Sequence, residues 1–482
     1  MLGSHAGRGD NPKVLSDVTA LLSTPAIIGW VVGALGAPAI AEAPVSAESA
    51  WVSVSDAEAP AASAPLTDPA ALSVPVADVP DPLVGPQPGA APTRTLAANT
   101  LLSDLTGLRS VQLATLAVDS ADFARDVLAA PPAAGQVAGM WATASAADRT
   151  QLVSGMPQLV GNLEGVPYAI RDLANRSYLQ VTIAEIRAQL EAGVGRAAAA
   201  ELEARLHMLA EVAEALEPGP SGEPRTLVSL DVSGEGTAVV AIGDLSSASH
   251  VSILVPGMYF GVDAQLVDWA STADAMLVEQ VAWADRLGLE PDFATVAWIG
   301  YHTPTLVSVA SLELAEEGRV ALGASLEGII AVRADDPPFL SVLAHSYGST
   351  AAALALQEGA VAVDALAMVG SPGSPATSSA DLAVRAGNVW AASASWDPVT
   401  GSGLFGAVPT DAEYGAHRFG VSDVADPVTG SVLPGIVSHN DYFTPGSSSM
   451  RNMALIALGH GELVLDDSGR YALAAQKSLA RG

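Results

Sequence analysis

One serine of this sequence stands where it could act as a nucleophile. An apolar run, Phe339 to Leu343, leads into Ala344-His345-Ser346-Tyr347-Gly348, and a stretch of small residues follows. This pattern predicts a buried strand, a sharp turn at Ser346 and then a helix. Small residues beside the turn let its strained backbone pass close to its neighbours. The sequence therefore predicts a nucleophile elbow, and a buried strand that happens to meet a serine-rich turn is the alternative.

A serine hydroxyl becomes a nucleophile when a histidine can take its proton and a carboxylate orients that histidine. Asp397 follows an expected strand over residues 389–393, and the proline after it turns the chain away. We predict Asp397 as the acid, although the same pattern is typical of an ordinary turn aspartate. Asp364 comes before an expected strand instead of after one. Asp423 and Asp426 lie in an expected loop and are weaker alternatives.

With such an elbow, the order of the three groups along the chain is serine, then acid, then histidine. The base is therefore expected after Asp397, on a loop directly before a C-terminal helix. His439 has that position, since residues 447–458 are expected to be helical. His460 closes this helix, where a histidine complements the helix dipole. His417, in the long loop, is expected to be solvated. His345, beside the nucleophile, is expected to pack against the sheet without a catalytic role.

An acyl-transfer site also needs two backbone N–H groups for the negative charge that develops on the carbonyl oxygen. One is expected from Tyr347, the residue after the nucleophile. The other is expected from the turn after the third strand, with Met258 as the donor and Gly257 letting the backbone approach closely. Tyr259 is expected to line the acyl side of the pocket. Since the sequence shows neither a metal-ligand cluster nor a phosphate-binding loop, we predict no metal and no cofactor.

The elements that must position these residues begin near residue 225. Apolar runs at residues 227–232 and 237–242, joined by a glycine-rich turn, predict an antiparallel hairpin. Strands and helices then alternate, which predicts a mostly parallel sheet with helices on both faces, an α/β fold. Residues 97–220 have helical spacing of their leucines and predict an α-helical region. Residues 42–96, rich in alanine and proline, predict a disordered linker.

Composition excludes some functions. The chain has 482 residues and a net charge of −31 without a basic patch, so we predict no nucleic-acid partner. It contains no cysteine, which excludes thiol catalysis and disulfides. Residues 1–41 combine basic residues, an apolar run and a small-residue cleavage site, as a secretory signal does. Pro25 and several glycines interrupt that run, so a cytoplasmic protein with a disordered tail is the alternative, and no firm membrane span is predicted.

Several motifs carry a family resemblance. In chain order they are Pro157 to Pro167 with Arg171-Asp172 and Ala174-Asn175, Val255-Pro256-Gly257, Trp298-Ile299-Gly300-Tyr301, His345-Ser346-Tyr347-Gly348-Ser349, and His439. Together they resemble a largely uncharacterised actinobacterial α/β-hydrolase family over roughly residues 140–460. The resemblance implies an α/β-hydrolase fold with a Ser/Asp/His triad, and a helical region that belongs to the same unit. The chain departs from the family at Ala344, where the elbow has its first glycine, and at His302, where an acidic residue is expected.

These expectations favour a serine hydrolase over residues 225–482. Its substrate would be a small-molecule or lipid ester, cleaved through an acyl-enzyme on Ser346. An ester is favoured over an amide by analogy, because esters are the commonest substrates of this fold. A non-catalytic binding module on the same scaffold, and a peptidase or amidase, are the alternatives. Residues 399–437, rich in glycine and proline, are expected to form a lid over the pocket.

Overall fold

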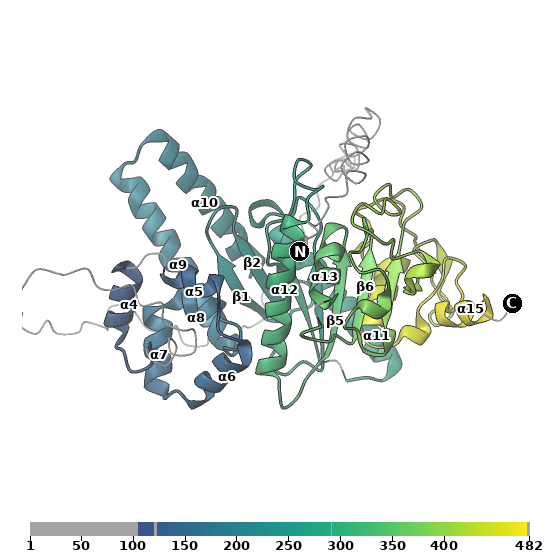
Figure 1. The fold of residues 1–482 in the computed structure, drawn as a ribbon, viewed down its shortest axis with the longest axis horizontal. Helices are drawn as coiled ribbons and strands as arrows, with labels where there is room; N and C mark the ends of the chain where they lie inside the picture. The colour runs from purple at the N-terminus through teal and green to yellow at the C-terminus, as the bar shows by residue number, and fades with distance from the viewer. Residues whose placement is uncertain (1–104, 120–122, 291, 358, 480–482) are drawn as a thin grey trace, which may run out of the picture. The chain divides into compact units, whose positions relative to one another are not determined.

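A central sheet organises the chain. The computed structural model describes residues 105–119, 123–290, 292–357 and 359–479. Among these residues, one eight-stranded sheet has the order β1-β2-β4-β3-β5-β6-β7-β8 (Figure 1). The strands are β1 (Arg225–Asp231), β2 (Thr237–Ile242), β3 (His250–Val255), β4 (Phe293–Ile299), β5 (Phe339–His345), β6 (Ala365–Val369), β7 (Val389–Ala392) and β8 (His417–Arg418). The β1–β2 and β2–β4 pairs are antiparallel and the other pairs are parallel, which confirms the predicted sheet.

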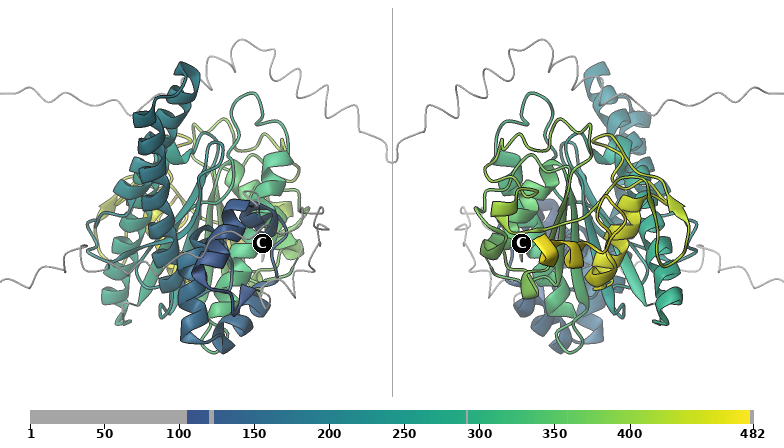
Figure 2. Two further views of the ribbon diagram at one scale, coloured as in Figure 1. Left: turned by 90° about the vertical axis from the view of Figure 1, so that its left-hand side faces the viewer. Right: turned by 90° about the vertical axis from the view of Figure 1, so that its right-hand side faces the viewer.

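Helices cover both faces of the sheet (Figure 2). Those described are α4 (Ser110–Asp119), α5 (Phe123–Ala129), α6 (Ala134–Thr143), α7 (Ala146–Gly155), α8 (Pro157–Asn162), α9 (Tyr168–Ala192), α10 (Arg196–Ala215), α11 (Val262–Leu287), α12 (Glu313–Val332), α13 (Tyr347–Gln357), α14 (Ser448–Ala457) and α15 (Ala472–Leu479). One apolar core lies between the sheet and α9, α10, α11 and α14, and a second lies between the sheet and α12 and α13. A third apolar cluster joins α4 to α8.

The order of the strands places two loops together. In the sheet, β4 lies on one side of β3 and β5 lies on the other. The chain therefore reverses its direction of winding at β3. Open parallel sheets bind ligands at the carboxyl ends of the strands at such a point. Val255 pairs with Ala344 near these ends. The turn after β3 and the serine after β5 therefore lie side by side.

Side chains of α8 and α9 pair with the outer edge of β1, in the place of a further strand. Asn162 donates to the carbonyl of Leu230 at 3.0 Å and accepts its N–H at 2.9 Å. Asp172 accepts the N–H of Leu227 at 2.7 Å, and Asn175 donates to the Leu227 carbonyl at 3.0 Å. Buried backbone groups without a partner would cost free energy. The motif from Pro157 to Asn175, one of those that carry the family resemblance, thus satisfies backbone groups at the edge of the sheet.

Two predicted segments lie outside the described residues, and the predicted lid differs in part from the structure. The expected signal segment at residues 1–41 and the linker at 42–96 lie outside the described residues. None of the described helices has both the length and the apolar character needed to cross a membrane. Part of the expected lid is sheet instead, because β8 pairs with β7, and β9 (Val424–Ala425) pairs with β10 (Val432–Leu433).

The prediction that His417 is solvated is wrong. Its ring is half-buried on β8, with its centroid 5.0 Å from that of the Trp390 ring, and its Nδ1 is 3.0 Å from the side-chain oxygen of Gln476. The physical reason is that β8 continues the sheet, and this covers the histidine between a strand neighbour and the C-terminal helix.

The contact between α9 and β1 generates a stability prediction. The Asn175→Ala variant should lower the free energy of unfolding by about 1–3 kcal/mol, because it leaves the Leu227 carbonyl without its side-chain donor and removes one of the two donors to the Gly161 carbonyl. Urea unfolding followed by circular dichroism measures this. Gln180→Ala, an exposed amide on the same helix, is the matched control and should change the value by less than about 0.5 kcal/mol. Equal losses in the two variants would contradict the role of Asn175.

Candidate active site

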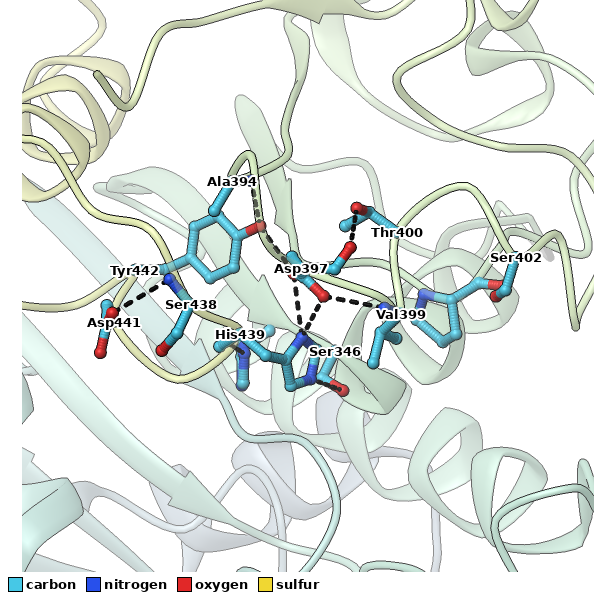
Figure 3. A network of polar contacts seen from close by, with 12 residues as sticks. Ser346, Ala394, Asp397, Val399, Thr400, Ser402, Ser438, His439, Asp441 and Tyr442 are labelled. Carbon is cyan, nitrogen blue, oxygen red and sulfur yellow. Dashed lines mark hydrogen bonds and ion pairs between the residues drawn. The ribbon is translucent and has the colours of Figure 1, made fainter. Parts of the chain in front are cut away.

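Ser346, His439 and Asp397 come together at the carboxyl end of the sheet (Figure 3). His439 Nε2 is 2.8 Å from Ser346 Oγ, and His439 Nδ1 is 2.9 Å from each carboxylate oxygen of Asp397. Because a carboxylate only accepts hydrogen bonds, Nδ1 carries the ring proton, and Nε2 is able to accept the proton of the serine hydroxyl. The three residues are 3%, 5% and 7% exposed, respectively. This arrangement can activate a serine for nucleophilic attack.

The backbone at Ser346 is strained. Its φ angle is +52°, in the left-handed region that non-glycine residues occupy at a cost of roughly 1–3 kcal/mol. Hydrogen bonds on both sides hold it there. The Ser346 N–H donates to the Val369 carbonyl at 2.9 Å, and the Ser346 carbonyl accepts the Ser349 hydroxyl at 2.6 Å. Since β5 ends at His345 and α13 begins at Tyr347, the serine stands alone at the turn.

The neighbours of the turn must lack side chains. A β-carbon at Gly257 would lie 2.6 Å from Ser346 Cβ, and one at Gly348 would lie 2.3 Å from the carbonyl oxygen of Pro256. Both distances are below any normal contact. Ala344, by contrast, buries its methyl group in the core beneath α12 and α13. The elbow thus accommodates alanine at its first small position and requires glycine at its last.

Two backbone N–H groups near the serine are free of partners. Neither the Tyr347 nor the Met258 N–H donates a hydrogen bond to any residue that the structure describes. Tyr347 is the first residue of α13, and the first N–H groups of a helix have no acceptor within it. Met258 follows Gly257, whose β-carbon position is 3.1 Å from Ser346 Oγ. These groups are available to an oxygen of a bound ligand.

Asp397 accepts hydrogen bonds besides that of His439. The Tyr442 hydroxyl donates to Oδ2 at 2.8 Å, and the Val399 N–H donates to Oδ1 at 2.9 Å. The Tyr442 hydroxyl in turn accepts the Ala394 N–H at 2.7 Å. Burial raises the pKa of Asp397, but the hydrogen bonds outweigh it, and the pKa lies below its ordinary value. The group is therefore a carboxylate, which keeps the proton of His439 on Nδ1.

Sequence reasoning gave no role to two residues of this site, Tyr442 and Gly370. Gly370 has φ +63° directly after β6, and a β-carbon there would lie 3.1 Å from His439 Cε1 and 3.2 Å from Asp397 Oδ2. A glycine that ends a buried strand next to the elbow strand is a signal that could have identified it. The position of Tyr442, three residues after the histidine, carries no such signal.

The other candidate acids and bases lie in separate interactions. Asp364 accepts the Leu340 N–H, and Asp423 accepts the Gly435 N–H. Asp426 forms an ion pair with the buried Arg451 at 3.3 Å. His460 lies beyond the end of α14, with its Nδ1 2.8 Å from the Glu462 carboxylate. No group of three or more His, Asp or Glu side chains within the described ranges is arranged to hold a metal ion.

A pocket of about 530 Å³ lies beside the turn after β3, and Tyr259, Phe260 and His302 line part of it. His302 Nδ1 is 2.6 Å from Glu317 Oε1, and this hydrogen bond raises the pKa of His302. Ser346 lines neither this pocket nor a second one of about 570 Å³ along α5, α8 and α12. Ser346 is thus almost fully buried, and a pocket adjoins the turn next to it.

Comparison with protein families identifies the class of this fold. Residues 231–406 match the model of a family described as alpha/beta hydrolase. The chain therefore contains an α/β-hydrolase domain, and the predicted fold and resemblance are confirmed. Ser346 and Asp397 lie within the matching segment, whereas His439 lies beyond it.

Similar proteins come from mycobacteria. The uncharacterized protein Rv2079 of Mycobacterium tuberculosis is 27% identical over 385 residues, which cover 70% of this chain and 58% of that protein. This chain thus spans little more than half the length of that relative. The uncharacterized protein Mb0988c of Mycobacterium bovis is 28% identical over 208 residues, which cover 41% of this chain and 76% of that protein. Both relatives are actinobacterial, as the resemblance implied.

Two solved structures resemble this chain at a lower sequence identity. One comes from a study of two fungal esterases from Rhizomucor miehei, with a TM-score of 0.30 and 12% identity over 59% of this chain and 95% of that one. The other is a thermostable esterase from Pseudomonas putida, with a TM-score of 0.29 and 12% identity over 59% of this chain and 96% of that one. At these values the likeness says nothing about the substrate.

The hydrogen bond from Tyr442 generates a prediction about acid stability. Tyr442→Phe should raise the pKa of Asp397, because the carboxylate loses a donor. A carboxyl whose pKa is lower in the native than in the unfolded chain stabilises the fold above its unfolded pKa of about 3.9, and this stabilisation is lost as the pH falls through the native pKa. The variant should therefore unfold in acid at a higher pH than the wild type.

The free energy of unfolding of the same variant should be lower by about 1–3 kcal/mol near neutral pH, because the Ala394 N–H is left unpaired. Urea unfolding at a series of pH values measures both effects. Tyr471→Phe, a half-buried tyrosine outside this site, is the control. If both variants have the acid transition of the wild type, the Tyr442 hydroxyl does not support Asp397.

Proposed function

We propose that this chain is a serine hydrolase that cleaves carboxylic esters through an acyl-enzyme on Ser346. The observation that carries the proposal is the continuous hydrogen-bonded path from Ser346 Oγ through His439 to Asp397. A base within hydrogen-bond distance of the nucleophile, oriented by a carboxylate, is the arrangement that makes a serine reactive. The strained turn and the two free N–H groups beside it support the same reading.

The residues have the following roles in the proposed reaction. Ser346 Oγ attacks the carbonyl carbon of the ester while His439 Nε2 takes its proton. The carboxylate of Asp397 stabilises the imidazolium that forms. The N–H groups of Tyr347 and Met258 bind the oxyanion. His439 then gives its proton to the departing alkoxide, and a water molecule, activated by the same histidine, releases the acid and restores the serine.

The pocket beside the turn after β3 supports a small-molecule or lipid ester as the substrate. Its volume of about 530 Å³ is within the range of sites that bind small organic ligands, roughly 300–1,000 Å³. Tyr259 lines it and follows the proposed oxyanion donor, so the pocket is placed to hold the acyl side of a substrate.

Labelling with a fluorophosphonate probe tests the proposal. The wild type should be labelled covalently, whereas Ser346→Ala should not be labelled, and His439→Ala should react at least about 10³-fold more slowly. Ser325→Ala is the matched control, because Ser325 lies between glycines in a similar stretch but within α12. It should be labelled as the wild type is. Labelling that persists in Ser346→Ala would overturn the assignment of the nucleophile, and absence of labelling in the wild type would favour a binding module.

A substrate panel distinguishes an esterase from a peptidase or amidase. The wild type should hydrolyse p-nitrophenyl esters, with rates that depend on acyl chain length, and should leave peptide anilides intact. Ser346→Ala provides the background rate for both substrate classes. Faster cleavage of the anilides than of the esters would contradict ester hydrolysis while retaining the nucleophile.

A further inference from the structure

His345 lies between the two loops that serve the nucleophile. It directly precedes Ser346 and is 5% exposed. Its Nε2 is 2.7 Å from the main-chain oxygen of His439, and the centroids of the two imidazole rings are 4.8 Å apart. A β-carbon added at Gly257, in the turn after β3, would lie 3.3 Å from its Nδ1. The ring therefore contacts the loop of the base and lies near the turn after β3.

The protonation of His345 follows from this contact. A carbonyl oxygen only accepts hydrogen bonds, so Nε2 carries the ring proton. Burial, and after it the neighbouring His439, lower the pKa of His345 to about 3. The ring is thus neutral at any pH at which an imidazole base is active. Since Ser346 Oγ forms its hydrogen bond with His439, the contribution of His345 is to geometry and not to proton transfer.

The loop of the base needs such a contact. His439 lies between β10 and α14, outside any helix or strand. Two residues before it, the Val437 carbonyl accepts the Trp396 N–H at 3.1 Å. At His439 itself, the main-chain oxygen is held by His345. This bond joins the backbone of the base to a residue covalently linked to the nucleophile, so it limits how far the two reacting side chains can separate.

We propose that His345 is a positioning residue, whose Nε2–H holds the main chain of His439 so that its imidazole stays within reach of Ser346 Oγ. The proposal rests on the proposed function, because it assigns a further part to the same site. A displacement of about 1 Å of a catalytic group can lower a rate by about 100-fold. Loss of the donor should therefore reduce kcat and leave KM nearly unchanged, since the buried His345 acts through His439.

A pair of substitutions separates the hydrogen bond from the packing. Gln at position 345 keeps an N–H donor for the carbonyl, whereas Met has a similar length and no donor. We expect His345→Met to lower kcat, and the rate of fluorophosphonate labelling, by about 10–100-fold with KM within about twofold. His345→Gln should retain most of the wild-type rate. His417→Met, a half-buried histidine outside this site, is the control and should leave the rates unchanged.

A second measurement does not require turnover. The proton on His439 Nδ1, bonded to Asp397, should give a resolved low-field resonance in the NMR spectrum of the wild type. This resonance should persist in His345→Gln and disappear through exchange in His345→Met. If the wild type neither labels nor cleaves esters, the proposed function fails, and the resonance alone decides the role of His345.

Two outcomes would overturn the inference. One is a wild-type rate and a wild-type resonance in His345→Met. The other is an equal loss of rate in the Gln and Met variants in proportion to their loss of thermal stability, which would show a packing role only. Thermal unfolding of all the variants is therefore measured beside the kinetics.

Discussion

The left-handed backbone of Ser346 is the constraint on which the rest of the site depends. A serine in this conformation projects its hydroxyl away from the strand and the helix that flank it, but the backbone then runs very close to its neighbours. Gly257 after β3 and Gly348 in α13 provide the space that a β-carbon would fill. The hydrogen bonds from β6 and α13 offset the strain. Parallel strands, the glycines and Ser346 thus form one interdependent structure.

Position relative to secondary structure made much of this site predictable. Ser346, Asp397 and His439 were identified because each combines a reactive residue type with an expected strand end or helix start, and the structure brings the three together. Tyr442 and Gly370 could not be identified in this way. Their contacts arise where the loop of His439 meets the end of β6, which depends on tertiary packing and has no periodic pattern along the chain.

Short or polar elements were the least predictable. The two-residue strand β8 has no periodicity, so His417 was placed in a loop, although it continues the sheet. The helical region was predicted from its leucine spacing, but the partners of Asn162 and Asn175 were not, because amides on a helix resemble ordinary surface residues. Only the structure shows that they pair with β1. In the same way, the packing of His345 against the sheet is predictable, but its hydrogen bond to the main-chain oxygen of His439 is not.

The pairing of α8 and α9 with β1 also bears on how copies of this chain could associate. A strand at the edge of a sheet normally offers a row of free backbone groups to a strand of another molecule. Here side chains of the same chain already occupy such groups of Leu227 and Leu230, and the opposite edge ends in β8, which is only two residues long. Among the described residues, neither end of this eight-stranded sheet therefore offers a long free edge to a strand of a second copy. Pairing of this eight-stranded sheet with that of a second copy, edge to edge, is therefore disfavoured within the part of the chain that the structure describes.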